Sequence, residues 1–457
     1  MNLFLPSGPR PLHFVGIGGA GMSALALIAL RKGLPVTGSD LDTSGCGDLV
    51  AAGARIHAGH AAAQVGEARA VVVSAAIPTD HVEVQAAQAR GIPVIPRKEA
   101  LAGLIGAAPC VGVAGTHGKT TTTVMTTEAV AAAGFAVTGI AGGRVDAWGG
   151  NARIGGEELY VVEADEYDQA FLTLTPTIAV VNNVEADHLE CYGSLAALED
   201  AFVTFASRAR RALVGNDSAG AERVASRLPA AQVWRFGPQA ADLRLDAIET
   251  SGPTSRAALT LPGRGSVTLE LSVPGVHNLR NATAALGVVV ALGGDPVPAL
   301  AALSAFGGVG RRFERLGEVA GIALVDDYAH HPTELRATLA AARQAFPGRR
   351  LVAAFQPHLF SRTAAHADAM GDALAAADLA VVSDVYAARE QPIPGISGAL
   401  VAAAARRRGV ETVYEPSRAA LGARVTGLLR AGDVLLTLGA GDITQLGREV
   451  RARLEAA

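Results

Sequence analysis

Lysine and cysteine are both scarce in this chain of 457 residues. Lys32, Lys98 and Lys119 are its three lysines, so arginine carries most of the positive charge. The three cysteines are odd in number, far apart and without a CxxC pair, which argues against a disulfide framework or a zinc site and favours a reducing compartment. The formal net charge of −4 offers no basic surface to a nucleic acid or an anionic membrane. Because half of the residues are hydrophobic, the composition predicts compact domains.

Residues 12–30 contain no Asp, Glu, Lys or Arg, and this run is about as long as a membrane-spanning helix. Four glycines in its first half interrupt helical continuity, so a strand, a glycine turn and a helix account for the run better. Three prolines near the N-terminus argue against a signal peptide. We therefore expect a cytoplasmic protein with no membrane or nucleic-acid partner.

Short apolar runs alternate with helical patterns along the whole chain, which predicts βαβ units and mostly parallel sheets. Alternating residues over 232–273 predict a small antiparallel insertion. The interpretation is an α/β fold in three domains, 1–107, 108–312 and 313–457. The predicted helices of the first two domains are 20–32, 47–53, 81–90, 97–105, 119–133, 194–209 and 277–292.

The sharpest motif is GTHGKTTTT, Gly115 to Thr123, which lies between an apolar strand and a helical run. Its glycines allow successive backbone N–H groups and a helix N-terminus to bind a polyphosphate. Lys119 is then expected to reach the β- and γ-phosphates, and the hydroxyl of Thr120 to bind magnesium. Val113 stands where the strict pattern has its first glycine. The alternative is a Gly/Thr-rich helix start with a solvated lysine.

Two acidic segments follow predicted strands. VVEADEYD contains Glu163, and VVNNVEADH ends in His188. Acidic residues at the carboxyl edge of a parallel sheet beside a nucleotide are natural magnesium ligands. Strand-end caps in solvated loops are the alternative for each segment, and a structural role is the alternative for His188 because magnesium prefers oxygen.

Nine motifs together resemble the Mur ligases of peptidoglycan synthesis, in the same order and over essentially the whole chain. They are GIGGAGMS (16–23), GTHGKTTTT (115–123), EADE (163–166), NNVEADH (182–188), GVHNLRNA (275–282), GVGRRFE (308–314), DDYAHHPTE (326–334), FQPHLFSRT (355–363) and GAGDI (439–443). The resemblance implies a Rossmann-like N-terminal domain that binds a UDP-sugar, a central P-loop ATPase-type domain and a Rossmann-like C-terminal domain.

The resemblance also assigns the cofactors, ATP and Mg²⁺, to particular residues. Thr120 is implied to hold a first magnesium ion, and Glu163 and His188 a second. Lys119, Glu163 and His188 are implied to be catalytic. The residues implied to bind ATP are Gly115, Thr116, His117, Gly118, Lys119, Thr120, Thr121, His277, Asn278, Asn281 and Arg312.

The implied reaction joins L-alanine to the lactyl carboxylate of UDP-N-acetylmuramate through an acyl phosphate. The attacking amine must be neutral, so a base is needed, and both His330 and His331 are candidates. Capping of a strand end is the alternative for this histidine pair. The residues implied to bind substrates are Gly18, Gly19, Ala20, Gly21, Met22, Ser23, Ser39, Asp40, Ser74, Tyr328, His330 and Arg362. A monomer or a weak homodimer is expected.

Two departures from the family pattern stand out. Tyr167 replaces the serine of the usual EADESD. Several relatives bridge magnesium with a carbamylated lysine, but no lysine follows Lys119 here. Glu199 lies in about the right predicted helix to substitute for that lysine.

Two other functions are compatible with parts of the sequence. Within the family, a recycling ligase attaches a whole tripeptide to the same UDP-sugar, although GIGGAGM fits the alanine-adding type better. A dinucleotide-dependent oxidoreductase is the rival from another class, because GIGGAG opens a helix and Asp40 lies at the spacing of a ribose ligand. The second glycine loop at residue 115 has no role in hydride transfer.

Overall fold

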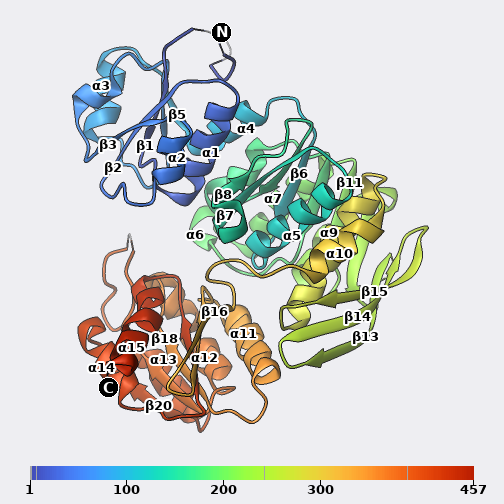
Figure 1. The fold of residues 1–457 in the computed structure, drawn as a ribbon, viewed down its shortest axis with the longest axis vertical. Helices are drawn as coiled ribbons and strands as arrows, with labels where there is room; N and C mark the ends of the chain where they lie inside the picture. The colour runs from blue at the N-terminus through green and yellow to red at the C-terminus, as the bar shows by residue number, and fades with distance from the viewer. Residues whose placement is uncertain (1–2, 7, 241, 389, 457) are drawn as a thin grey trace. The chain divides into compact units, whose positions relative to one another are not determined.

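Three β-sheets follow one another along the chain, each with helices packed against it (Figure 1). The computed structural model describes residues 3–6, 8–240, 242–388 and 390–456. The predicted three-domain α/β fold is confirmed. By their internal contacts the residues form two compact units, the first comprising Met1–Asp246, Ala258–Leu269 and Arg280–Ser304, and the second comprising Ala247–Ala257, Glu270–Leu279 and Ala305–Ala457.

The first sheet is parallel throughout, with strand order β3-β2-β1-β4-β5. Its elements are β1 (Leu12–Val15), α1 (Ala20–Arg31), β2 (Val36–Asp40), α2 (Gly47–Ala51), β3 (Arg55–Ala58), η1 (Ala62–Val65), β4 (Ala70–Val73), α3 (Val82–Ala89), β5 (Val94–Pro96) and α4 (Arg97–Ile105). The four helices predicted here are confirmed to within two residues at each end.

Apolar residues on both faces of this sheet are buried, as a doubly wound sheet requires. On β1, Phe14 packs in a cluster with α1 and α4, whereas Val15 belongs to a second cluster with α3. β1 has β2 on one side and β4 on the other. The connections that follow β1 and β4 therefore leave the sheet in opposite directions. This topological switch point is the usual binding crevice of such sheets.

The central sheet has the order β15-β14-β13-β12-β11-β10-β6-β9-β7-β8. Its elements are β6 (Cys110–Ala114), α5 (Lys119–Ala132), β7 (Val137–Val145), η2 (Asp146–Trp148), β8 (Gly150–Arg153), β9 (Leu159–Glu163), η3 (Tyr167–Thr173), β10 (Ile178–Val181), α6 (Leu189–Tyr192), α7 (Leu195–Ser207), β11 (Arg211–Gly215), α8 (Ala219–Ser226), η4 (Ala230–Gln232), β12 (Val233–Pro238), β13 (Leu243–Ser251), β14 (Thr254–Leu261), β15 (Gly265–Leu271), α9 (Val276–Ala291) and α10 (Pro296–Ser304).

Residues 232–273, where the sequence predicts a small antiparallel insertion, form strands that extend the central sheet, and β12 pairs with its neighbours in parallel. It lies between β11 and β13, so the hydrogen-bonded ladder continues from β11 to β13 without a break. The alternating pattern was read correctly as strands. Their attachment was missed because alternation reports which face of a strand is buried and says nothing about its neighbour.

Two lysines join the N-terminal sheet to the central domain within the first unit. Lys32 at the end of α1 donates to Glu157 at 2.9 Å, and Lys98 in α4 donates to the carboxylate of Asp168 at 2.8 Å. Helix α1 also packs against β7 and β8. Two of the three lysines therefore form ion pairs between consecutive domains.

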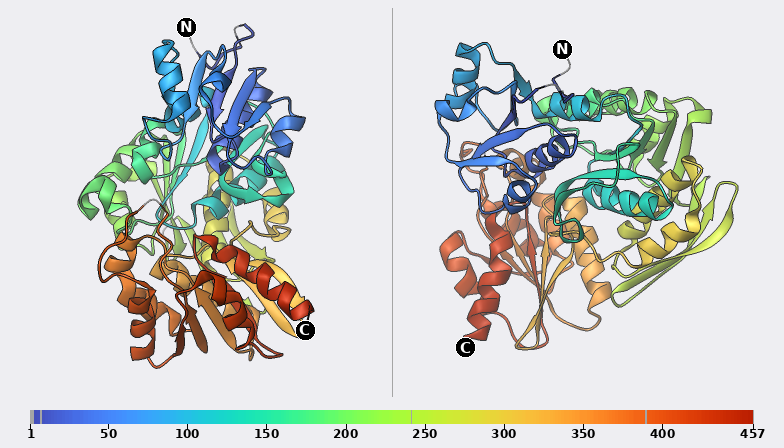
Figure 2. Two further views of the ribbon diagram at one scale, coloured as in Figure 1. Left: turned by 90° about the vertical axis from the view of Figure 1, so that its left-hand side faces the viewer. Right: turned by 45° about the horizontal axis from the view of Figure 1, so that its top comes forward.

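The third sheet has the order β16-β17-β21-β18-β19-β20, with one antiparallel edge strand, β16. Its elements are β16 (Glu314–Val319), β17 (Ile322–Asp327), α11 (Pro332–Ala345), β18 (Leu351–Phe355), α12 (Phe360–Leu374), β19 (Leu379–Val382), α13 (Gly398–Arg407), β20 (Glu411–Tyr414), α14 (Arg418–Thr426), β21 (Val434–Leu438), η5 (Asp442–Gln445) and α15 (Leu446–Glu455). Alternate strand residues separate into two apolar clusters, one with α11–α13 and the other with α14 and α15, so helices cover both faces (Figure 2). Within the described residues, every helix is too short or too polar to cross a lipid bilayer.

Phe205 of α7 supports the strand that leads into the phosphate-type loop. Its ring lies so close to Gly112 of β6 that a Cβ there would come within 2.7 Å of the ring, and it stacks on Phe171 with centroids 5.1 Å apart. We expect Phe205→Ala to destabilise the central domain by about 3–5 kcal/mol, because a buried aromatic ring is lost and a cavity remains. Thermal unfolding should shift downward by on the order of 10 °C. Leu41→Ala, at a side chain that is 80% exposed, is the control and should leave the transition within about 0.5 kcal/mol.

Candidate active site

The phosphate-type loop runs from the end of β6 to the start of α5, as the sequence predicts. Gly115 and Gly118 have φ of 135° and 77°, which side chains other than glycine rarely adopt. A Cβ on Gly115 would also come within 3.1 Å of the backbone nitrogens of Asn182 and Asn183, and one on Gly118 would lie 2.9 Å from Asn281. Both glycines are therefore required by conformation and by space. The backbone N–H groups of Thr116 and His117 donate to Asn183, whereas the first N–H groups of a helix such as α5 have no partner within the helix.

Lys119, the first residue of α5, is surrounded by carboxylates. Its Nζ donates to both carboxylate oxygens of Glu166 at 2.7 Å and lies 3.9 Å from Asp165. Burial alone would lower the pKa of Lys119, but the charges of Glu166 and Asp165 outweigh burial and raise it. The side chain is thus a permanent cation at neutral pH, the form that binds phosphate.

Thr120 and Glu163 place two oxygen donors together beside Lys119. The Thr120 hydroxyl donates to Glu163 at 3.0 Å, and the backbone N–H of Gly142 in β7 donates to the other carboxylate oxygen at 2.5 Å. A hydroxyl next to a fixed carboxylate fits Mg²⁺, which prefers oxygen ligands. Sequence reasoning missed β7, whose three glycines disguise a nine-residue strand.

His188 is held by its own loop. Its Nδ1 lies 3.5 Å from Glu190, its Nε2 lies 3.8 Å from Asp187, and its ring meets Tyr167 edge-on with centroids 5.2 Å apart. Within the described chain, no direct contact joins His188 to Thr120 or Glu163. Tyr167, the residue that departs from the family pattern, therefore links the EADE loop to the loop after β10.

Asparagines after β10 hold the phosphate-type loop in place, a role that the sequence did not assign to them. Asn183 accepts from the backbone N–H of His117 at 2.7 Å, and Asn182 donates to Thr122 at 3.0 Å. Thr116 accepts from the backbone N–H of Glu185 at 2.9 Å. Thr121, also predicted to bind ATP, is 8% exposed. The signal was the NN pair directly after an apolar strand next to β6.

The predicted ATP ligands of α9 are divided by the structure. Asn281 accepts from Thr122 at 3.0 Å, which places it against the loop. Asn278 instead donates to the carbonyl of Pro274 at 2.7 Å, one turn back at the start of its own helix. His277 lies against Gly275, where a Cβ would meet its ring at 2.4 Å. The three-residue spacing places the two asparagines on one face of the helix. Helix geometry alone does not show which of the two side-chain amides hydrogen-bonds to the backbone at the start of the helix.

The N-terminal glycine loop lies at the switch point of the first sheet. The Asp40 carboxylate at the end of β2 accepts from the backbone N–H of Gly18 at 2.8 Å, and Ser74 follows β4 directly. This bond occupies Asp40 with the loop itself, which weakens the dinucleotide interpretation. Ser23 donates to the carbonyl of Ala20 at 3.0 Å. Gly18, Gly19 and Ala20 are exposed, and Gly21 is half-buried.

Two predicted substrate residues of this domain lie elsewhere. Ser39 is fully buried, and its hydroxyl donates to Glu83 at 2.7 Å. Successive residues of a strand point to opposite faces, so Ser39 turns away from the loop that its neighbour Asp40 binds. Met22 is 2% exposed and packs in the domain core. The side chains of Ser39 and Met22 are therefore structural in this arrangement.

Glu83 is the centre of that buried polar group. Burial would raise its pKa, but hydrogen bonds from His13 and Ser39 and the charge of His13 hold it below the ordinary value. The His13 Nε2 lies 3.3 Å from Glu83, and the His60 Nδ1 lies 3.5 Å away. This group stabilises the first domain rather than lining the loop.

The predicted residues of the third domain gather around the carboxyl end of β17. Tyr328 lies under the guanidinium groups of Arg311 and Arg312, 4.8 and 4.9 Å from its ring centroid, and meets the ring of His330 at 5.1 Å. Arg362 lies 3.3 Å from His358, whose ring is 5.9 Å from that of His330. His358 was not assigned a role from the sequence.

Hydrogen bonds distinguish the two adjacent histidines. His330 Nδ1 lies 2.9 Å from the carbonyl of Tyr328, which can only accept, so Nδ1 carries the proton and Nε2 is the basic nitrogen of the neutral ring. His331 Nδ1 accepts from the backbone N–H of Thr333 at 3.3 Å and caps α11, with Glu334 completing a capping box. The capping alternative thus holds for His331, at a helix rather than a strand.

Glu199 is engaged by a cation. Both Nε and Nη2 of Arg223 donate to its carboxylate, at 2.9 and 2.6 Å, and the residue is 7% exposed. A carboxylate neutralised in this way has a structural role between α7 and α8, which does not support its substitution for a metal-bridging lysine.

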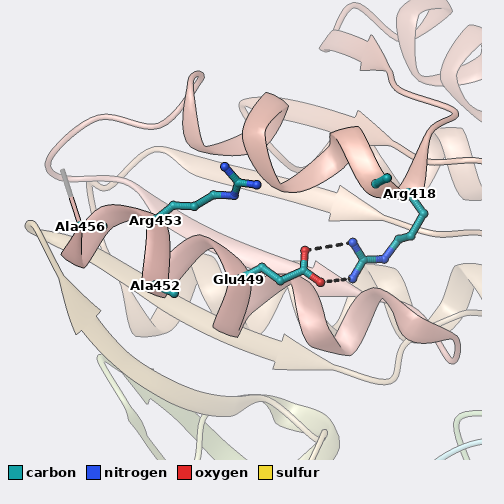
Figure 3. A pocket seen from close by; sticks show the side chains of 6 residues that line it. Arg418, Glu449, Ala452, Arg453 and Ala456 are labelled. Carbon is teal, nitrogen blue, oxygen red and sulfur yellow. Dashed lines mark hydrogen bonds and ion pairs between the residues drawn. The ribbon is translucent and has the colours of Figure 1, made fainter.

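A shallow hollow between α14 and α15 contains none of the predicted residues (Figure 3). Arg418 and Glu449 form a two-point ion pair along its side, with distances of 2.7 and 3.0 Å. With Arg453, which also lines the hollow, the lining has one more positive than negative side chain.

Comparison with known proteins agrees with this geometry along the whole chain. Three family models match in order: "Mur ligase family, catalytic domain" at residues 11–108, "Mur ligase middle domain" at 113–289 and "Mur ligase, glutamate ligase domain" at 311–441. The chain belongs to the Mur ligase family.

Individual relatives narrow the similarity. The UDP-N-acetylmuramate–L-alanine ligase of Salinibacter ruber is 46% identical over 95% of this chain and 93% of its own length. The UDP-N-acetylmuramate–L-alanine ligase of Clavibacter michiganensis is 44% identical over 100% of this chain and 96% of its own length. The crystal structure of UDP-N-acetylmuramate–alanine ligase from Thermotoga maritima has a TM-score of 0.82, is 28% identical, and matches over 98% of this chain and 100% of that one.

Thiol reactivity tests the packing around this site. Cys46 and Cys110 are buried, whereas Cys191, in α6 beside His188, is half-buried. Burial raises the pKa of Cys110 to about 12, and burial with the nearby charge of Asp40 raises that of Cys46. The native protein should therefore react with one equivalent of a thiol reagent near pH 8, at Cys191. Cys191→Ser should abolish the fast phase, and rapid reaction at Cys110 would contradict the structure.

Proposed function

We propose that this chain joins L-alanine to the lactyl carboxylate of UDP-N-acetylmuramate at the expense of ATP, an early step of peptidoglycan synthesis. The observation that carries the proposal is the full-length similarity to alanine-adding ligases together with a charged lysine in a loop shaped for phosphate. We place the reaction in the cytoplasm, assign the domains to residues 1–107, 108–312 and 313–457, and expect a monomer or a weak homodimer.

ATP is assigned to the loop between β6 and α5. The loop of Gly115 to Thr121 would bind its phosphates, chiefly through the N–H groups at the start of α5, because those of Thr116 and His117 donate to Asn183. Lys119 would exchange its carboxylate partner for a phosphate oxygen. Asn281 supports the loop through Thr122. In contrast, the bond from Asn278 to Pro274 makes that residue a weaker candidate for direct contact.

Two magnesium ions are proposed, the first held by Thr120 and the second by Glu163 and His188. The ions would neutralise charge on the phosphates during transfer. Glu163 is already oriented for this role by the N–H of Gly142. His188 would need to leave Asp187 and Glu190, which makes it the least prepared of the three.

The proposed chemistry has two steps. The lactyl carboxylate attacks the γ-phosphate, so its oxygen gains the phosphoryl group while ADP leaves. The amine of L-alanine then attacks the acyl carbon, the bond to phosphate breaks, and the amine gives up a proton. Lys119 contributes positive charge near the transferring group, so positioning and electrostatics account for most of the catalysis.

The base that accepts the amine proton is assigned to His330. Its Nδ1–H is fixed by the Tyr328 carbonyl, which leaves Nε2 as the acceptor, whereas the acceptor nitrogen of His331 is used in the helix cap. Tyr328 and Arg362 are proposed to orient the amino acid, and Arg312 to lie near phosphate. The exposed loop of Gly18 to Ala20 is proposed to receive the UDP-sugar pyrophosphate, with Asp40 and Ser74 close by.

Phosphate release tests the proposal directly. Purified protein is given ATP, Mg²⁺ and UDP-N-acetylmuramate with L-alanine, other amino acids or the tripeptide. We expect release that depends on L-alanine, with a matching increase in the mass of the UDP-sugar. Release with the tripeptide alone would move the assignment to the recycling type. No release with any acceptor would refute the proposed reaction, and Glu163→Ala is the matched inactive variant.

Replacing the two adjacent histidines should give different results. We expect His330→Gln to lower kcat by roughly 10²-fold or more, because a general base is lost. His331→Ala should lower the free energy of unfolding by about 1 kcal/mol through loss of the cap on α11, with kcat within about threefold of the parent. Steady-state kinetics and thermal unfolding on both variants make the comparison. A larger loss of kcat in the His331 variant would reverse the assignment.

A further inference from the structure

Glu166 is the most deeply buried acid beside the phosphate-type loop, and the proposed chemistry gives it no task. It is 1% exposed, and both of its carboxylate oxygens lie 2.7 Å from Lys119 Nζ. Tyr192 donates its hydroxyl to the Glu166 carbonyl, which fixes the backbone at this point. The carboxylate is thus presented to Lys119 from a rigid position.

Lys119 has two competing partners. The lysine side chain is a flexible stem that carries a single point charge with three N–H donors, and its ammonium group already lies 2.7 Å from both oxygens of Glu166, so a phosphate oxygen must compete with Glu166 for it. When it turns to a phosphate oxygen, Glu166 remains in a buried place without its cation, and leaving one member of a buried pair uncompensated is costly. The free energy of that separation is subtracted from the free energy of nucleotide binding.

The surroundings of the pair strengthen this conclusion. Asp165 lies 3.9 Å from the same ammonium group. Glu163, a third carboxylate, accepts a hydrogen bond from the hydroxyl of Thr120, the residue that follows Lys119. Without a nucleotide, Lys119 is therefore the cation that offsets three clustered carboxylates. Of the three, Glu166 makes the shortest contacts and is the least exposed, so it is the residue whose loss should matter most to where Lys119 lies.

We propose that Glu166 is a positioning residue that holds Lys119 in a resting place and thereby weakens nucleotide binding. The inference rests on the proposed role of Lys119 in binding the phosphates. An enzyme that must release ADP in every cycle gains from such a competitor, because the ion pair re-forms as the product leaves. The residue acts through Lys119 and does not need to touch the nucleotide.

Equilibrium binding of ADP in EDTA, measured by calorimetry, tests this without metal or turnover. Glu166→Gln keeps the shape of the side chain and removes its charge, so Lys119 is released to the phosphates. We expect ADP to bind about tenfold more tightly than to the parent, a gain of about 1.4 kcal/mol. The KM for ATP should fall in parallel, while the KM for L-alanine stays the same.

A double-mutant cycle separates action through Lys119 from direct repulsion of the phosphates. In the Lys119→Ala background, Glu166→Gln should change ADP affinity by less than about twofold, because the competing pair no longer exists. Equal tightening in both backgrounds would show that Glu166 repels the nucleotide directly and would overturn the proposal.

Asp433→Asn is the matched control. Asp433 is 1% exposed and is paired at two points with Arg350, at 2.9 and 3.0 Å, in the second unit. Its replacement removes an equally buried pair that has no part in the nucleotide site, and ADP affinity should not move.

Unchanged or weaker binding by the Glu166→Gln variant would overturn the inference. If that variant does not fold, as judged by circular dichroism, Glu166→Asp draws the carboxylate back by one methylene and should tighten ADP binding about threefold. Absence of ADP binding by the parent protein even with Mg²⁺ would refute the proposed function itself, and the inference with it.

Discussion

The burial of one lysine among carboxylates is the constraint on which the central domain depends. Lys119 is paired to Glu166 on both oxygens, which requires the segments after β6 and β9 to meet, while Asn182 and Asn183 after β10 hold the loop that carries Lys119. A parallel sheet meets that requirement, because β6 lies between β9 and β10 and all three end at one edge. The phosphate-type loop, the EADE loop and the asparagine loop therefore meet where each strand stops.

In the other two sheets, too, the loops at the ends of the strands are held in place by contacts with other residues. In the first, the glycine loop after β1 is fixed by Asp40 from the neighbouring strand, so one backbone N–H is committed and the exposed remainder faces outward. In the third, Tyr328 and His330 follow β17 and are held by arginines and a backbone carbonyl. Each domain thus provides a strand end at which contacts fix the orientation of the loop, from the neighbouring strand in the first domain and partly from the loop itself, at His330, in the third.

The sequence pattern was sufficient to predict features that depend on neighbouring residues. It was insufficient where a residue can pair with more than one partner. The helices were predicted closely because apolar period and glycine turns are local properties, as for α4 and α5. Ser39 and Asp40 were assigned together, yet strand alternation sends them to opposite faces. The parallel pairing of β12 with β13 and the ion pair of Glu199 with Arg223 depend on contacts between separate elements, which the pattern within one element does not encode.

The distribution of lysine has a practical consequence for anyone who handles this protein. All three lysines lie in the first 119 residues, two of them fasten the first domain to the second, and the last is buried in its ion pair. Amine-reactive dyes and cross-linkers therefore find no side-chain target in the third domain. An endoprotease that cuts after lysine would release residues 120–457 as one uncut fragment.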